Sequence, residues 1–146
     1  MIYFTDTNPD EAASNLCDRH LRKTVIFTQK VFSEAAENRT QHRDPYIRWG
    51  CASLMNLKWV IEHGNAAAHE LYYRFHKPVR IEDSLPLIKA REKMDSLGLP
   101  PVDPDRISFP DSVDKVRELY RLKVFPKSRW TRRYPPDWMH PSLLVK

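Results

Sequence analysis

The longest uninterrupted stretch of this 146-residue chain runs from Pro9 to Pro45, with no proline or glycine between them. Apolar residues within it recur at the three- and four-residue spacing of an α-helix. Asn8 precedes the stretch as a candidate N-cap, and Glu11 follows three residues later, where it would complete a capping box. We therefore predict a first long helix from about Pro9 to about Glu37.

A second long helix is predicted from about Pro45 to about Phe75. Asp44 can cap it, and Pro45 suits the first helical position because that position needs no N–H donor. Gly50 and Gly64 stand where helices can approach closely or where the helix can bend. We expect the two helices to pack together through their apolar sides and to bury four side chains, Leu16, Phe27, Trp49 and Trp59.

The rest of the chain is punctuated by prolines, of which the sequence has twelve against three glycines. A shorter helix is predicted over residues 86–97, ended by Gly98, and a last helix begins at Asp111 or Ser112. Residues 121–146 form an irregular, basic and aromatic C-terminal segment. The predicted fold is all-α, a compact single domain over residues 1–146 with about four helices, the two long ones first.

The composition excludes several classes of protein. Hydrophobic residues make up 41% of the chain, which at this length is enough for a core without disulfides or a structural metal. No apolar run reaches the roughly 20 residues that cross a bilayer, and the N-terminus lacks the pattern of a signal peptide. We expect a soluble, intracellular protein with no membrane partner, located in the cytoplasm, at the nucleoid or in a phage-infected cell.

The cysteines and histidines give little indication of a metal site. Cys17 and Cys51 are too few for a disulfide scaffold, and Cys17 is interpreted as a small buried residue that stays mainly a thiol at neutral pH. None of the six histidines has another at the three- or four-residue spacing of helical metal ligands. We expect neither a metal nor another cofactor.

Positive charge is concentrated at the C-terminal end. The whole chain carries +5, yet residues 121–146 alone carry +6 and the first 120 residues carry −1. Aromatic residues are interleaved with the basic ones, and this combination binds phosphates and stacks on bases. The alternative is that the aromatic rings clamp the segment onto the core. We expect a surface for double-stranded DNA built from Arg19, Arg22, Lys30, Lys127, Arg129, Trp130, Arg132 and Arg133.

One face of the first predicted helix carries candidate catalytic groups. His20 and Lys23 lie one turn apart, an imidazole for acid–base work and an amine that desolvation can make nucleophilic. Glu70 is the candidate carboxylate, although it precedes Arg74 by four residues and so also fits an ion pair. If the protein is an enzyme, we expect His20, Lys23 and Glu70 to converge in one basic cleft. Alternatively, His20 is a buried, hydrogen-bonded structural residue.

Several positions share their order and spacing with a known group of proteins: Asp18-Arg19-His20-Leu21-x-Lys23, Asp44-Pro45, Trp49, Ser53, Asn56, Trp59, His63, Glu70, Arg74-Phe75 and Pro136-Asp137-Trp138. In these positions the chain resembles a family of small phage and bacterial proteins grouped with the phage pyrimidine-dimer DNA glycosylases of the endonuclease V type. The resemblance spans residues 1 to about 77 and the region near residue 138. It implies a compact, all-helical fold that binds DNA.

The resemblance also implies base-excision chemistry, with an N-terminal amine as nucleophile and a glutamate on the first helix. Phe27 stands where that glutamate is expected, and the bulky Ile2 follows Met1. Three hypotheses result. The leading one is an enzyme that excises or modifies an unusual pyrimidine after extruding it from the duplex. The others are a non-catalytic, phage-type DNA-binding accessory protein and a protein-binding regulator.

Overall fold

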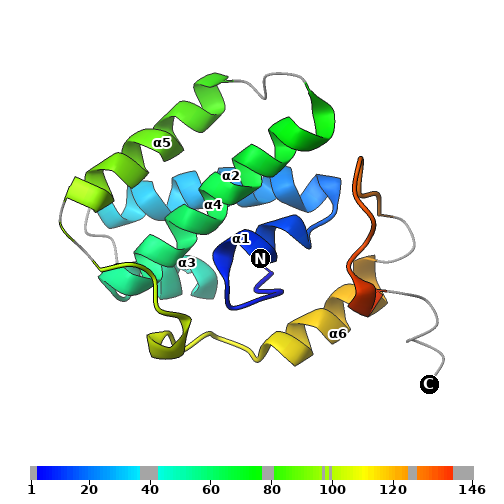
Figure 1. The fold of residues 1–146 in the computed structure, drawn as a ribbon. Coiled ribbons are helices and arrows are strands. Elements are labelled where there is room, and N and C mark those ends of the chain that lie inside the picture. Colours follow the sequence, from blue (N-terminus) through cyan, green and yellow to red (C-terminus); the bar gives the residue numbers. More distant parts are fainter. Residues whose placement is uncertain are drawn as a thin grey trace.

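A computed structural model describes residues 3–36, 43–76, 81–96, 98, 100–124 and 128–139, and in these ranges the chain is all-helical, without a strand (Figure 1). The elements are α1 (Pro9–Ser14), α2 (Asp18–Ala36), α3 (Pro45–Cys51), α4 (Leu54–Phe75), α5 (Ile81–Ser96), the 3₁₀ turn η1 (Pro104–Arg106), α6 (Val113–Val124) and the 3₁₀ turn η2 (Asp137–Met139). The all-α prediction is confirmed. The described residues hold six α-helices rather than about four, because both long predicted helices are broken. The single-domain assignment stays a prediction.

The first predicted helix is interrupted at residues 15–17. The Cys17 backbone N–H donates to the Tyr120 hydroxyl at 2.9 Å instead of to a carbonyl one helical turn earlier. The Cys17 carbonyl then accepts the N–H groups of His20 and Leu21, which starts α2 on a new axis. A hydroxyl supplied by α6 therefore fixes where α2 begins.

Three predicted caps are present. The side-chain oxygens of Asn8, Asp44 and Ser112 accept N–H groups from the first turns of α1, α3 and α6. These bonds satisfy donors that a helix leaves without partners at its start. The capping-box prediction is wrong, because the Asn8 N–H donates to Asp6 Oδ1 at 2.9 Å and not to Glu11.

The second predicted helix is interrupted before α4. The Ser53 backbone is extended (φ −152°, ψ 159°), and its hydroxyl caps α4 by accepting the Asn56 N–H at 3.1 Å. The Asn56 amide in turn donates to the Trp49 carbonyl at 2.9 Å, which satisfies the open end of α3. Further along, α5 begins at Ile81 rather than near residue 86, and Gly98 (φ 67°) follows its end as predicted.

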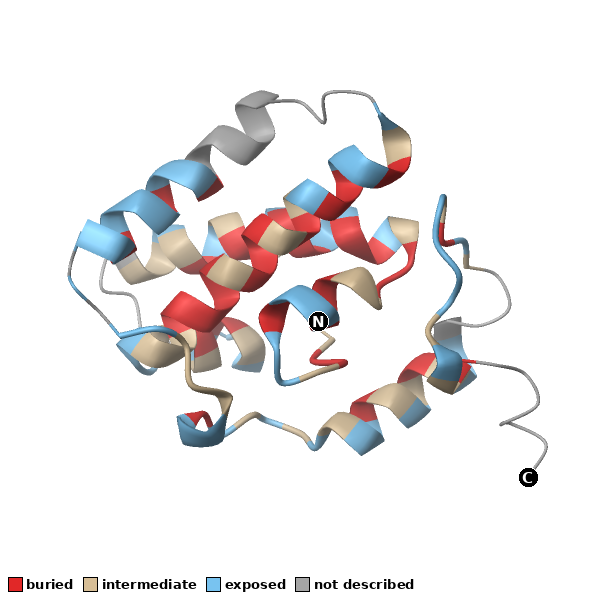
Figure 2. Ribbon diagram, viewed as in Figure 1, coloured by how far each residue is buried: buried red, intermediate tan, exposed pale blue. Residues whose placement is uncertain are grey.

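Helix α4 lies at the centre of the described structure, with α1, α2, α3 and α5 around it (Figure 1), and Figure 2 shows buried residues along most of its length. Leu16 and Trp59 are fully buried, whereas Phe27 and Trp49 are only partly buried against the core. The burial prediction is thus confirmed for the first pair and holds only in part for the second. Among the described segments, no helix combines the length and apolarity needed to cross a bilayer.

The crossing of α2 and α4 depends on Gly64. A Cβ atom at this position would lie 2.6 Å from Thr28 Cβ, which is closer than real Cβ contacts come. We expect Gly64→Ala to lower the free energy of unfolding by about 2 kcal/mol, because overpacking at a close helix contact forces the backbones apart. In the Thr28→Gly background the same substitution should cost clearly less. Urea unfolding of the four proteins of this double-mutant cycle measures the coupling, and an equal cost in both backgrounds contradicts it.

His63 makes stability depend on pH. Its ring is fully buried and stacked on Trp59, and Nδ1–H donates to the Pro9 carbonyl at 3.1 Å. Burial lowers the pKa of His63 to about 4, although the bond to Pro9 acts in the opposite direction. The histidine of the unfolded chain has an ordinary pKa near 6.5, so as the pH falls it binds a proton before the folded protein does.

The contribution of neutral His63 to the free energy of unfolding is fully present above a pH of about 6.5. It is lost as the pH falls toward the folded-state pKa of about 4. Across that window we expect the wild type to lose about 3 kcal/mol of unfolding free energy through His63. His63→Gln, which keeps an N–H donor for Pro9, should lack this part of the loss. Urea unfolding of both proteins at neutral pH and near pH 4 tests this, and parallel losses would contradict it.

Candidate nucleic-acid interface

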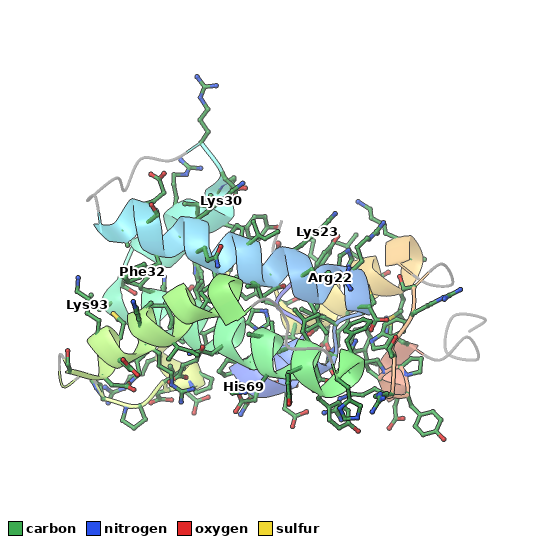
Figure 3. The ribbon with its side chains drawn as sticks, turned by 90° about the horizontal axis from the view of Figure 1, so that it is seen from above. Arg22, Lys23, Lys30, Phe32, His69 and Lys93 are labelled. Carbon is green, nitrogen blue, oxygen red and sulfur yellow. The ribbon has the colours of Figure 1, made fainter. Side chains whose placement is uncertain are left out.

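The exposed side of α2 carries a row of cations. Arg19, Lys23 and Lys30 are all exposed, and their spacing of four and seven residues places them on one side of the helix. Figure 3 shows Lys23 and Lys30 along the same outer edge of α2. At 1.5 Å per residue the row spans about 16 Å. We call these three residues the α2 cation row.

The acid beside the start of this row is engaged by another cation, and Glu34 lies one helical turn beyond Lys30 at the other end. Asp18, the acid in the first turn of α2, accepts a hydrogen bond from Arg74 Nη1 at 3.1 Å. Within the described part of the chain, none of the three row residues forms an ion pair. Arg22, exposed on the neighbouring side of α2, has its guanidinium 5.1 Å from the centre of the Phe75 ring, a cation–π contact that leaves its charge available.

The C-terminal segment is attached beside the start of the α2 cation row. The Asp18 backbone N–H donates to the Arg129 carbonyl at 2.8 Å, and the Thr131 N–H donates to Asp18 Oδ1 at 3.0 Å. Trp130 is 7% exposed, and its indole N–H donates to the Asn15 carbonyl at 2.9 Å. Its ring is therefore an anchor for the segment and has no free face for a base, contrary to its predicted DNA-binding role.

Arg129 and Arg132 are exposed, as a phosphate-binding role requires. Arg133 differs, since its Nε and Nη2 both donate to Glu70, the Nη2 bond being 2.9 Å. Its guanidinium also lies 4.6 Å from the centre of the Tyr73 ring. Arg133 thus fastens the segment to α4. Lys127 lies outside the described residues.

Glu70 is committed to ion pairs. Oε1 accepts from Arg74 Nε at 3.0 Å, which is the predicted four-residue pair, although it is buried rather than on the surface. Burial alone raises the pKa of Glu70, but the bonds from Arg133 and Arg74 outweigh it and hold that pKa below the ordinary value. A carboxylate stabilised in its charged form is a poor proton donor at neutral pH.

His20 belongs to a different, buried cluster. It is 4% exposed, its Nδ1 lies 2.8 Å from the Tyr120 hydroxyl, and its ring stacks on Tyr3 with centroids 4.7 Å apart. This is the environment of a structural histidine, the alternative reading of the sequence. Lys23 is exposed on the outside of α2, where nothing desolvates its amine.

The predicted convergence of His20, Lys23 and Glu70 is therefore not found. His20 contacts α6, Lys23 faces solvent, and Glu70 contributes to a cleft of about 600 Å³ between α1, α4 and the C-terminal segment. That cleft is lined by Asp10, Glu11, Ser14, Ala66, His69, Glu70, Tyr73 and Arg133. Within the described ranges, no three or more His, Cys, Asp or Glu side chains are placed to hold a metal ion.

Cys17 differs from its sequence-based interpretation. It is buried as expected, and burial raises the pKa of its thiol. Hydrogen bonds with the His20 and Tyr120 side chains and with the His20 backbone outweigh burial, and the pKa falls to about 6. His20 lies only three residues from Cys17 and so could have been considered, whereas Tyr120 lies 103 residues away and gave no local signal.

No family model, no curated protein and no solved structure matches this chain. The functional proposals therefore rest on the geometry of the chain itself.

The thiol of Cys17 is expected to titrate near pH 6, so that thiolate predominates at neutral pH. The far-ultraviolet absorbance of the thiolate, followed against pH, measures this midpoint. Cys17→Ser is the control, because it leaves Cys51, whose pKa burial raises. A folded wild-type protein that first develops thiolate absorbance near the ordinary value of about 8.5 would contradict the prediction.

Proposed function

We propose that this protein binds duplex DNA by laying the exposed side of α2 along the phosphate backbone. The observation that carries the proposal is the α2 cation row, three exposed charges aligned over about 16 Å without ion pairs in the described structure. Cations arranged in this way displace the counterions condensed on DNA, and this release favours binding. The net charge of +5 acts in the same direction.

The geometry favours binding over chemistry on a base. Two arginines hold Glu70 in its ionised form. The His20 ring is stacked on Tyr3 and hydrogen-bonded to Tyr120, and Lys23 is exposed to solvent. Phe27, which stands at the position of the expected glutamate, is partly buried against the core. Of the three hypotheses drawn from the sequence, the non-catalytic DNA-binding protein is therefore the one that we propose.

The test compares two triple variants that remove the same charge from different helices. One replaces Arg19, Lys23 and Lys30 with alanine. The control replaces the exposed residues Lys89, Arg91 and Lys93 of α5. Figure 3 shows Lys93 at the end of the molecule away from Lys23. We expect the α2 variant to bind a labelled duplex roughly tenfold or more weakly, and the slope of log affinity against log salt to flatten by about 2 to 3.

Fluorescence anisotropy over a range of salt concentrations measures both quantities. Equal weakening by the two triple variants would contradict the proposed footprint, and a wild type that binds no duplex would favour the protein-binding hypothesis. Borohydride treatment of the same mixtures tests the catalytic hypothesis. A trapped protein–DNA adduct on a duplex with an abasic site or a damaged pyrimidine would reinstate it.

A further inference from the structure

The turn at residues 130–133 has an unusual residue at its third position. The Arg133 N–H donates to the Trp130 carbonyl at 3.1 Å, and Arg132 has φ 60°. This left-handed conformation, which type II turns require at the third position, is favourable for glycine and strained for arginine. The chain thus holds an exposed arginine where glycine would be easier to accommodate.

The turn is fixed on both sides of Arg132. The Trp130 indole N–H donates to Asn15, the Thr131 hydroxyl to Asp18 and the Arg133 guanidinium to Glu70. Three separate side chains thus attach the turn to the α1–α2 connection, to α2 and to α4. A turn held in this way presents the residues between and after its anchors in a defined orientation. Little conformational entropy is then lost when they bind a ligand.

Tyr134 follows the turn and is 95% exposed. The other two aromatic residues of the segment 128–139 serve in packing. Trp130 is buried, and Trp138 has its ring against Tyr120 and under the Arg117 guanidinium. Tyr134 is therefore the aromatic residue of this described segment that has both faces open for stacking.

The turn also lies at one end of the α2 cation row. Because the Asp18 N–H bonds to the Arg129 carbonyl, the Arg129 backbone lies beside Asp18, the residue that precedes Arg19. The exposed residues Arg129 and Arg132 thus belong to a turn that is attached to the first turn of α2. A strand whose phosphates follow α2 to its first turn reaches the segment that carries Tyr134.

We propose that Tyr134 and Arg132 form a site for an unpaired nucleotide, with the base stacked on the tyrosine ring and its phosphate held by the arginine. The inference rests on the proposed binding of DNA along α2 and makes the preferred ligand a duplex that continues into a single strand. Every base offers a flat face for stacking, and the segment 128–139 has two exposed arginines, Arg129 and Arg132, besides Arg133, which is paired with Glu70. An acidic peptide would satisfy the arginines but would give Tyr134 no planar partner.

Fluorescence anisotropy with three labelled probes tests the site: a blunt duplex, the same duplex with a short single-stranded tail, and the single strand alone. Tails of both polarities are compared. The wild type should bind the preferred tailed duplex about tenfold more tightly than the blunt one, as expected for one stacked base. Tyr134→Ala should abolish this gain and leave blunt-duplex binding unchanged, whereas Tyr134→Phe keeps the ring and should retain the gain.

Arg132→Gly is the second variant, because glycine accepts the same backbone conformation and keeps the turn. It should weaken binding of the tailed duplex and reduce its salt slope by about 1, relative to the blunt duplex. Unchanged binding of the tailed duplex in this variant overturns the role of Arg132. Competition by an acidic peptide that matches the single strand would assign the surface to a protein partner and overturn the nucleotide site.

The outcomes separate this site from the function on which it rests. If the wild type binds the blunt duplex without any gain from a tail, or if Tyr134→Ala and Tyr134→Phe behave alike, the nucleotide site is rejected and duplex binding stands. If the wild type binds only the single strand, and Tyr134→Ala weakens that binding, the duplex proposal fails and the nucleotide site stands.

Discussion

The buried guanidinium of Arg74 is the interaction on which most of the described structure depends. The residue is 0% exposed, and its nitrogens donate to Glu70 on α4, to Asp18 on α2 and to the Ser14 carbonyl at the end of α1. A charge removed from water is tolerated only when its donors are satisfied, so these partners must stay in place. Three helices are therefore held in one arrangement by a single side chain.

The same network explains why the candidate catalytic groups are separated. Asp18 and Glu70 satisfy Arg74 and also hold the C-terminal segment, through Thr131 and Arg133. Their carboxylates form ion pairs and hydrogen bonds that join elements distant in the sequence. The α2 cation row does not join elements of the described structure in this way. Asp18 and Glu70 thus serve the structure, whereas the α2 cation row forms no ion pair within the described residues.

The sequence predicted features that local chemistry decides. Asp44 and Ser112 cap their helices because a short side-chain oxygen reaches N–H groups two or three residues away, and Glu70 pairs with Arg74 for the same local reason. The break at Cys17 was missed because its cause, the Tyr120 hydroxyl, comes from another helix.

The candidate site could be predicted only in part. His20 and Lys23 lie three residues apart, about 60° around the helix, so they were expected to share a face. The boundary of the core falls between them, which leaves one buried and the other exposed. Spacing gives the angle between two side chains, but only packing decides on which side of that boundary each one lies. The ion pair of Arg133 could not be predicted from the sequence either, because its partner Glu70 is 63 residues away.

The cleft between α1, α4 and the C-terminal segment affects how charge is distributed over the molecule. Its wall holds the carboxylates of Asp10 and Glu11, besides Glu70, whose charge is balanced by Arg74 and Arg133, and Figure 3 shows its residue His69 on the side of the molecule away from Lys23 and Lys30. Opposite charges on opposite sides give the molecule an electric dipole. If the protein binds DNA as proposed, the field of the polyanion would turn the molecule before contact so that α2 leads the approach. The asymmetry of the surface therefore acts on the rate of association, at distances where no hydrogen bond has yet formed.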